Sequence, residues 1–201
     1  MARSEEQFKE IRDQRYEEIS NAALKIFARK GFAGTKISDI TSSIHLSHGL
    51  LYHYFKSKED IYVSLITNVL DLFNQAIHEA EQLPGTPYDK LYWVTELTFK
   101  GDAGVALDRH MLMMGALHAD FLTEQTKQMI KQRYEASLRR IGDLVKAGQQ
   151  EGIFKQGDHM ELAAYYMSLS QGLMLWNAKG LYPINVTADM VMQPLLASEQ
   201  A

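Results

Sequence analysis

The chain contains no cysteine, and that absence excludes three kinds of site. Without a thiol there is no disulfide, no thiolate-bound metal and no cysteine nucleophile, and the composition fits a reducing compartment. The sequence also lacks an apolar run of the roughly 18 residues that a membrane-spanning helix needs. Its first residues are charged, whereas a secretion signal has an apolar centre. We therefore expect a cytoplasmic protein that does not enter a membrane.

Proline is scarce too, with 4 in the chain, and no segment alternates apolar and polar residues as a half-buried strand does. Apolar residues recur every three or four positions instead. The stripe of Ile19, Ala22, Ala23, Ile26 and Phe27 is one example, and this period is typical of a helix with one buried face. The sequence therefore predicts an all-α protein of about nine or ten helices joined by short connections.

The chain is not basic overall, because its net charge is −4. The charge is unevenly distributed, however. Residues 1–60 hold 10 Lys or Arg against 9 Asp or Glu, whereas residues 61–201 hold 11 against 16. The amino-terminal part is therefore the better candidate for binding an anionic partner, but charge alone does not identify DNA.

Helix-start signals predict two short helices followed by a long one. Thr35 and Ser47 are expected to cap the short helices, with a tight turn at His45–Leu46 between them. Ser57 is expected to cap the long helix, which runs to about residue 82. Two short helices joined by a tight turn are the pattern of a helix-turn-helix.

The segment Ser47–Glu59 reads S-H-G-L-L-Y-H-Y-F-K-S-K-E and resembles the tetracycline repressor (TetR) family, with similarity over about residues 12–66. One departure is His45, where such proteins usually carry glycine. Because histidine tolerates left-handed backbone angles better than most residues, we expect the turn to be strained but intact. The resemblance implies an N-terminal three-helix DNA-binding domain in residues 1–60 and a larger C-terminal helical effector-binding and dimerisation domain in residues 61–201.

The short helix after Ser47 can place one face against DNA. Leu51 can face the small core, which leaves an outward stripe on a helix that can enter a major groove. His48, Gly49 and Leu50 are the expected base-reading residues. Hydroxyl, imidazole and ammonium groups suit phosphate oxygens, and the candidates are Thr35, Ser47, Tyr52, His53, Tyr54 and Lys58.

Lys58 carries an additional argument. It follows the Ser57 cap, where the helix dipole disfavours a cation unless an anion such as phosphate docks there. By resemblance, Tyr52, Tyr54 and Lys58 are the expected phosphate contacts. The alternative is that the two tyrosines are packing residues and that Lys58 is a solvated charge balanced by its neighbouring carboxylates.

Methionine and aromatic side chains occur throughout residues 88–176, where they can line an adaptable apolar cavity. Ordinary core packing explains the same residues and stays open as an alternative. The resemblance implies that a small-molecule inducer, apolar or aromatic, binds here and shifts the protein away from its DNA-binding shape. The expected effector-binding residues are Trp93, Phe99, His110, Met111, Met114, His118, Phe121, Tyr134, Tyr166 and Trp176.

Two helices toward the carboxyl end are expected to pair with a second copy of the chain. The helix over residues 158–179 is apolar nearly all round, so it must be buried on two sides. A homodimer would present two recognition helices to an approximately palindromic double-stranded operator. The alternative is that these two helices pack against each other within one subunit. The expected interface residues are Leu138, Ile141, Val145, Gly148, Ala164, Ser168 and Gly172.

The sequence gives little support for an enzyme, because it has no Gly-rich phosphate loop, no G-x-S-x-G and no H-E-x-x-H motif. His45, His48 and His53 could in principle bind a metal, but DNA contacts account for two of them, and we expect neither a metal nor a cofactor. The predicted function is a ligand-responsive repressor. The alternative is a helical small-molecule-binding or adaptor protein that binds no operator.

Overall fold

The computed structural model describes residues 5–179 and 185–198, and within these ranges it forms helices and one isolated β-bridge. This arrangement confirms the predicted all-α fold. The elements are α1 (Glu5–Gly34), α2 (Ile37–Ser43), α3 (His48–Tyr54), α4 (Lys58–Gln82), α5 (Pro87–Phe99), α6 (Ala103–Leu117), α7 (Glu124–Gln150), α8 (His159–Lys179), α9 (Ala188–Met192) and the short 3₁₀ helix η1 (Gln193–Leu195).

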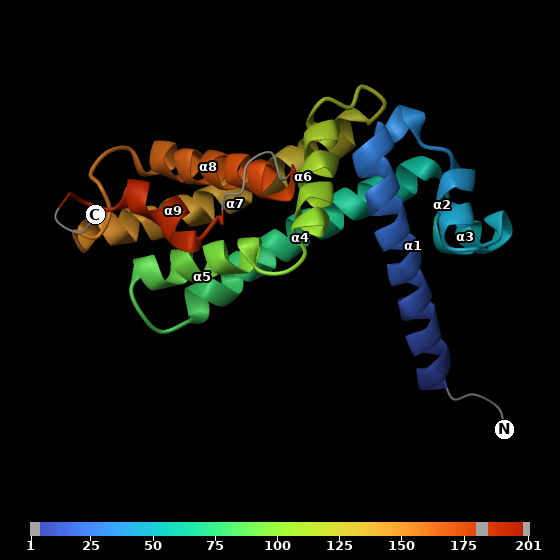
Figure 1. Ribbon diagram of the computed structural model, residues 1–201, viewed down its shortest axis with the longest axis horizontal. Helices are drawn as coiled ribbons and strands as arrows, with labels where there is room; N and C mark the ends of the chain where they lie inside the picture. Colours follow the sequence, from blue (N-terminus) through green and yellow to red (C-terminus); the bar gives the residue numbers. More distant parts are fainter. Residues whose placement is uncertain (1–4, 180–184, 199–201) are drawn as a thin grey trace.

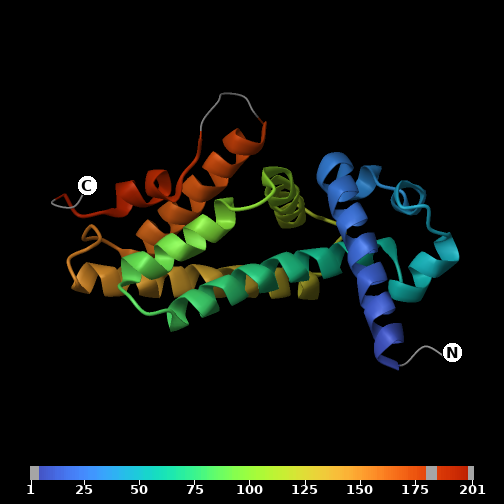
Figure 2. The ribbon, with the colours of Figure 1, turned by 60° about the horizontal axis from the view of Figure 1, so that its bottom comes forward.

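The molecule is elongated, and different helices build its two ends (Figures 1 and 2). Helices α1, α2 and α3 form one end, which we call the head, and α5, α8 and α9 gather at the other. Helix α4 runs from the head toward the far end and packs along α7. Helix α6 packs against both α1 and α8, so it connects the head with the far end of the molecule.

A first apolar core holds the head together and extends beyond it. Ile19 and Phe27 of α1, Ile40 of α2 and Leu51 of α3 are buried in this core. Buried residues of α4, α6 and α7 continue it, so the core crosses the predicted domain boundary at residue 60, which stays a prediction. These continuing residues include Ile61, Tyr62, Leu65, Ile66, Leu112, Met113, Ala116 and Ile130.

A second apolar core fills the far end of the molecule. It gathers side chains from α4, α5, α7, α8 and α9, and Phe154, in the connection between α7 and α8, is completely buried in it. The buried members include Ile77, Leu91, Val94, Ile141, Val145, Ala163, Tyr166, Val191 and Met192.

Two of the predicted helix caps are confirmed. The Ser47 hydroxyl accepts a hydrogen bond from the Leu50 backbone N–H at 3.2 Å, and the Ser57 hydroxyl accepts one from Asp60 N–H at 3.0 Å. An unpaired N–H at a helix start is satisfied in this way, which fixes the residue at which the helix begins. Helices α3 and α4 therefore begin where the sequence predicts.

The cap predicted at Thr35 is wrong. Helix α1 has a left-handed residue at Gly31 (φ 67°) and then continues to Gly34, which leaves Thr35 in the connection to α2. The Thr35 side chain is buried, and its hydroxyl donates to the Gly31 carbonyl at 2.7 Å. Lys36 precedes the first residue of α2 instead, and its N–H is bound by the Asp39 carboxylate at 3.0 Å.

None of the helices in the described ranges is long and apolar enough to cross a membrane. Within the same ranges, no three His, Asp or Glu side chains lie together as a metal site requires. His45, His48 and His53 accordingly form no such cluster with carboxylates or with one another.

Candidate DNA-binding surface

The turn between α2 and α3 has the tight geometry that a helix-turn-helix requires. His45 adopts a left-handed conformation with φ of 52°, as the sequence predicts for the position usually held by glycine. The Leu46 N–H donates to the Thr41 carbonyl at 2.8 Å, which closes the turn at the end of α2. Helix α3 thus follows α2 after a short connection of fixed shape.

Helix α3 divides into a buried face and an exposed face. Leu51 and, at its C-terminal cap, Phe55 are buried in the first core. Tyr52 is 49% exposed and Leu50 40% exposed. His48, Gly49 and His53 are exposed as well, so this part of the predicted DNA-binding set shares one accessible surface. An accessible stripe of imidazole and phenol groups on a short helix fits a major groove.

The remaining predicted phosphate contacts lie in different surroundings. Ser47 is exposed, although its hydroxyl oxygen already accepts the Leu50 N–H. Tyr54 is half-buried and lies beside a groove between α1 and α3. Thr35 is buried, so its hydroxyl cannot reach a phosphate in this conformation. The DNA contacts themselves remain predictions.

Lys58 has a structural role that the sequence argument did not include. Its ammonium donates to the carbonyl oxygens of Phe32 and Thr35, at 2.9 Å each. It also lies 4.2 Å from the centre of the Phe32 ring, a distance at which a cation interacts with the π face. The cation near the start of α4 is therefore accounted for without a phosphate. The phosphate contact proposed for Lys58 stays a prediction.

The groove beside Tyr54 was missed by the sequence analysis. It is open to solvent and is lined by Phe8, Lys9, Arg12, Asp13, Tyr16 and Tyr54. The Tyr16 ring stacks on Phe55 with ring centres 5.0 Å apart. The first half of α1 carries few apolar residues and is mostly exposed. It therefore lacks the apolar helical periodicity by which the sequence could have indicated that it packs beside α3.

The residues predicted to bind an effector do not converge on one cavity. Trp93, Phe99 and Tyr134 are half-buried and pack against the second core. Tyr166 is buried, and its hydroxyl lies 2.8 Å from the Thr95 hydroxyl. The remaining six lie nearer the surface. Met111, His118, Phe121 and Trp176 are exposed, and His110 and Met114 on α6 are half-buried.

Burial lowers the pKa of His110 from its ordinary value, because desolvation disfavours the charged imidazole. His110 is thus biased toward its neutral form, in which one ring nitrogen donates and the other accepts a hydrogen bond. The pKa of Tyr166 is raised to about 12 by burial. Both groups are therefore uncharged near neutral pH, as walls of an apolar site would be.

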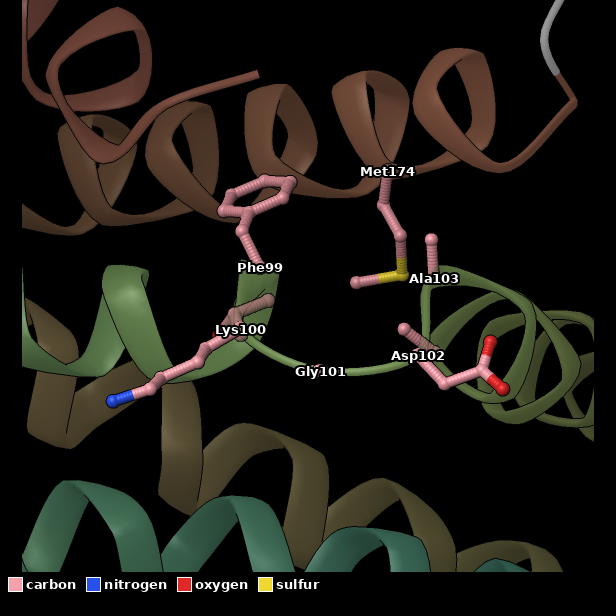
Figure 3. Close-up of a pocket in the computed structure, with 8 residues that line it drawn as sticks. Phe99, Lys100, Gly101, Asp102, Ala103 and Met174 are labelled. Carbon is pink, nitrogen blue, oxygen red and sulfur yellow. The ribbon is translucent and has the colours of Figure 1, made fainter. Parts of the chain in front are cut away.

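A small pocket lies where α5, the connection to α6 and α8 meet (Figure 3). The Phe99 ring and the Met174 side chain lie on its α8 side, whereas the Lys100 ammonium and the Asp102 carboxylate point away from it. Its volume is about 10 Å³, which is space for about one water molecule. Phe99 is the one predicted effector residue that lines it. An effector of ordinary size would therefore require α6 or α8 to move.

The predicted dimer interface stays a prediction, and its residues on α7 differ from those on α8 in how accessible they are. Ile141 and Val145 are completely buried in the protomer's own second core, and Leu138 packs against it. Gly148 is covered by the Phe154 ring. Ile141, Val145 and Gly148 therefore have no surface left for a second subunit in this conformation, whereas half-buried Leu138 keeps some.

On α8, by contrast, the predicted small residues are accessible. Ala164, Ser168 and Gly172 are exposed, as are Tyr165, Leu175 and Trp176 on the neighbouring positions of the same face. We call this set the α8 face. Large apolar side chains are thus exposed on a helix whose other side is packed in the second core.

Comparison with known proteins gives a consistent result. Residues 19–65 match the sequence profile of the family described as bacterial regulatory proteins, tetR family. The fatty acid metabolism regulator protein of Bacillus subtilis is 27% identical over 149 residues, which cover 74% of this chain and 75% of the relative.

Solved structures share the whole fold. The ketosteroid transcriptional regulator KstR2 of Mycobacterium tuberculosis gives a TM-score of 0.74 at 18% identity and covers 92% of this chain and 96% of its own. AibR in complex with isovaleryl coenzyme A and operator DNA gives a TM-score of 0.65 at 19% identity, with coverage of 90% and 95%.

The matched segment 19–65 spans the second half of α1, both helices of the helix-turn-helix and the start of α4. It contains the left-handed turn at His45, the Ser47 cap and the exposed face of α3 described above. The sequence match and the geometry therefore concern the same residues. Residues 19–65 thus form a helix-turn-helix DNA-binding segment that matches the TetR family, and over most of its length the chain is similar to transcription regulators.

Proposed function

We propose that this protein represses transcription by binding a palindromic operator as a homodimer and that a small apolar effector releases it. The observation that carries the proposal is the exposed face of α3, where His48, Gly49, Leu50, Tyr52 and His53 are accessible together. His48 and Gly49 lie in the first turn of the helix, the part that approaches base edges in helix-turn-helix complexes. The action would take place in the cytoplasm, where operator DNA is accessible.

The dimer is proposed to form through the α8 face. Small residues at Ala164, Ser168 and Gly172 let another helix approach closely, and Tyr165 and Trp176 supply apolar area at the edges. A two-fold axis through this face would give the dimer two heads, one from each subunit. Two heads are required because one short recognition helix reads only half of a palindromic site.

The effector is proposed to enter among α5, α6 and α8, where the small pocket at Phe99 and Met174 lies. One observation supports this location, and a second concerns the chemistry of the effector. Half-buried Met114 and His110 on α6 can rearrange without breaking the fully buried core. The relatives reported above are named for fatty acid and ketosteroid regulation or bound to isovaleryl coenzyme A, which supports an effector with an apolar body.

The operator proposal is tested by selecting duplexes from a random DNA pool with the wild-type protein and measuring their retardation in a gel. We expect an enriched inverted repeat that binds at least about 1000-fold more tightly than unrelated DNA at the same salt concentration. A helical adaptor or ligand carrier would enrich no sequence, and that result would overturn the proposal.

The dimer is tested by Ser168→Arg, which places a cation in the centre of the α8 face. We expect this variant to sediment as a monomer and to lose tight binding to the selected repeat. Asn68→Arg is the matched control, because Asn68 is exposed on α4 outside that face. Sedimentation of the Ser168 variant as a dimer would contradict this interface.

The effector is tested by a thermal-shift screen of free fatty acids, acyl coenzyme A esters and aromatic acids, followed by operator titrations with each compound that stabilises the protein. A compound that binds the DNA-incompetent shape more tightly must weaken operator binding. A compound that raises the melting temperature and leaves operator affinity unchanged would contradict the effector part of the proposal.

A further inference from the structure

The turn between α6 and α7 places Phe121 directly against the head. The Phe121 ring stacks on Phe32, with ring centres 3.6 Å apart and planes within 9° of each other. The Phe121 ring also makes an edge contact with the Tyr62 ring of α4, and their ring centres lie 5.4 Å apart. Phe121 therefore contacts both α1 and α4, although it lies in the half of the chain from which the sequence predicted an effector site.

Phe32 carries a second group on its ring. The Lys58 ammonium lies 4.2 Å from the ring centre. Two groups at these distances cannot share one face of a ring, so Phe32 lies between Phe121 and Lys58. Stacked aromatic pairs and cation–π contacts each add to the packing energy of the rings involved. The position of the Phe32 ring is thus set jointly by the α6–α7 turn and by α4.

Lys58 also fixes the backbone between α1 and α2. Its ammonium donates to the carbonyl oxygens of Phe32 and Thr35, on either side of the end of α1. Within the same segment, Thr35 donates to the Gly31 carbonyl. These bonds determine the direction in which α2 leaves α1, and α3 follows α2 through the closed turn at His45. The orientation of the recognition helix is therefore linked to the Phe32 ring.

We infer that Phe121 is a positioning residue for operator binding: by stacking on Phe32 it keeps Lys58 on the α1–α2 connection and holds α3 in its DNA-binding orientation. This inference rests on the proposed function. It also changes the expected role of Phe121, which the sequence placed in the effector site. Movement of the α6–α7 turn would reach the end of α1 through this ring, in addition to the packing of α6 against α1.

The Phe121 stack is not needed to hold the core together. Phe121 is 39% exposed and lies in a turn, whereas Tyr62, which its ring contacts, and Phe27, which contacts Tyr62, are buried. Tyr62 remains anchored without it, because its hydroxyl donates to the Leu112 carbonyl at 3.3 Å. Removal of the Phe121 ring should therefore change the orientation of the head more than the stability of the fold.

The experiment compares operator affinity in Phe121→Ala and Phe121→Tyr, using the duplex selected by the wild-type protein. We expect Phe121→Ala to bind roughly 3- to 10-fold more weakly, the range that corresponds to one lost aromatic pair. Phe121→Tyr keeps the ring and should bind within about twofold of the wild type. Leu117→Ala is the matched control, because Leu117 is an exposed apolar residue at the end of α6.

A double-mutant cycle tests whether Phe121 acts through Phe32. We expect Phe32→Leu and Phe32→Leu/Phe121→Ala to have equal operator affinities. Once the Phe32 ring is gone, the stacking interaction is already lost, so removal of the Phe121 ring has no further effect. Circular dichroism melting and sedimentation show whether each variant is folded and dimeric. If Phe32→Leu does not fold, Lys58→Met serves instead, with the same expectation for its combination with Phe121→Ala.

The outcomes separate the two proposals. A wild-type protein that selects no DNA sequence overturns the proposed function. Tight binding by the wild type together with unchanged affinity of folded, dimeric Phe121→Ala overturns the positioning role alone. Equal and additive losses from Phe32→Leu and Phe121→Ala would also overturn it, because the two rings would then act independently.

Discussion

Arg140 of α7 binds the Glu81 carboxylate of α4 through two hydrogen bonds, from Nε to Oε1 at 2.9 Å and from Nη2 to Oε2 at 2.6 Å. A third bond runs from Nη1 of Arg140 to the Asn74 carbonyl at 3.0 Å. Bidentate pairs of this kind are stronger than single contacts between surface charges. The pair joins the two long helices that connect the ends of the molecule.

The hydrogen bond from Arg140 lowers the pKa of Glu81 below its ordinary value of 4.5. Because the pKa is lower in the folded than in the unfolded state, the stabilisation is present above pH 4.5 and is lost as the pH falls through the folded-state pKa. We expect Glu81→Gln to reduce the free energy of unfolding near neutral pH by about 0.5–1 kcal/mol. In urea titrations, this difference from the wild type should shrink in acid, and a difference independent of pH would contradict the assignment.

The buried hydroxyl pair of Thr95 and Tyr166 should couple α5 to α8. Thr95 donates its proton to the Leu91 carbonyl at 2.7 Å, so the Tyr166 hydroxyl is the donor to Thr95 at 2.8 Å. Thr95→Val would leave that donor unpaired and should cost about 1–3 kcal/mol of unfolding free energy. Thr95→Val/Tyr166→Phe removes both partners and should cost less than the sum of the single changes. Additive losses would show that the pair is not coupled.

Gly148 is required by the close approach of Phe154. A β-carbon at this position would lie 2.2 Å from Cδ2 of the Phe154 ring, which is completely buried. Gly148→Ala should therefore lower the free energy of unfolding by about 1–3 kcal/mol, as overpacking of a core does. Gly34→Ala is the control, because its β-carbon would meet the Lys30 side chain at an ordinary 3.5 Å. A stable Gly148 variant would mean that the Phe154 ring can move aside.

The left-handed residue in the helix-turn-helix should be a site of strain. His45 has a φ of 52°, a conformation that costs an L-residue about 1–2 kcal/mol. His45→Gly should raise the free energy of unfolding by up to about 1 kcal/mol, since glycine adopts this angle freely but loses more chain entropy on folding. His45→Val should be destabilised. Chemical denaturation of the three proteins checks the order, and a glycine variant less stable than the wild type would indicate a contact made by the imidazole.

Tyr52 and His48 are expected to contribute to operator binding in different ways. Tyr52→Phe should weaken binding to all duplexes by a similar factor of roughly 10, because a phosphate contact carries no sequence information. His48→Ala should instead change the ranking among single-base variants of the selected repeat. Competition binding with those variants measures both effects. A uniform loss in His48→Ala would remove His48 from the base-reading set.

The sequence alone determined the local features of this protein. Helix periodicity predicted the all-α fold, and the short-range rule that a serine hydroxyl accepts an N–H three residues later predicted the starts of α3 and α4. The segment Ser47–Glu59 led to the family, and the outward stripe on α3 followed from its buried Leu51. These features depend on residues close together in the chain, so a pattern in the sequence contains them.

Only the tertiary structure decided what depends on distant residues. The apolar stripe of α7 was compatible with either a second subunit or the protomer's own core, and packing places Ile141 and Val145 in that core. Lys58 binds carbonyls at the end of α1, and Phe121 stacks on Phe32 rather than lining a cavity. Helix periodicity shows that a face is apolar but not which surface covers it, because that choice is made by contacts between segments far apart in the chain.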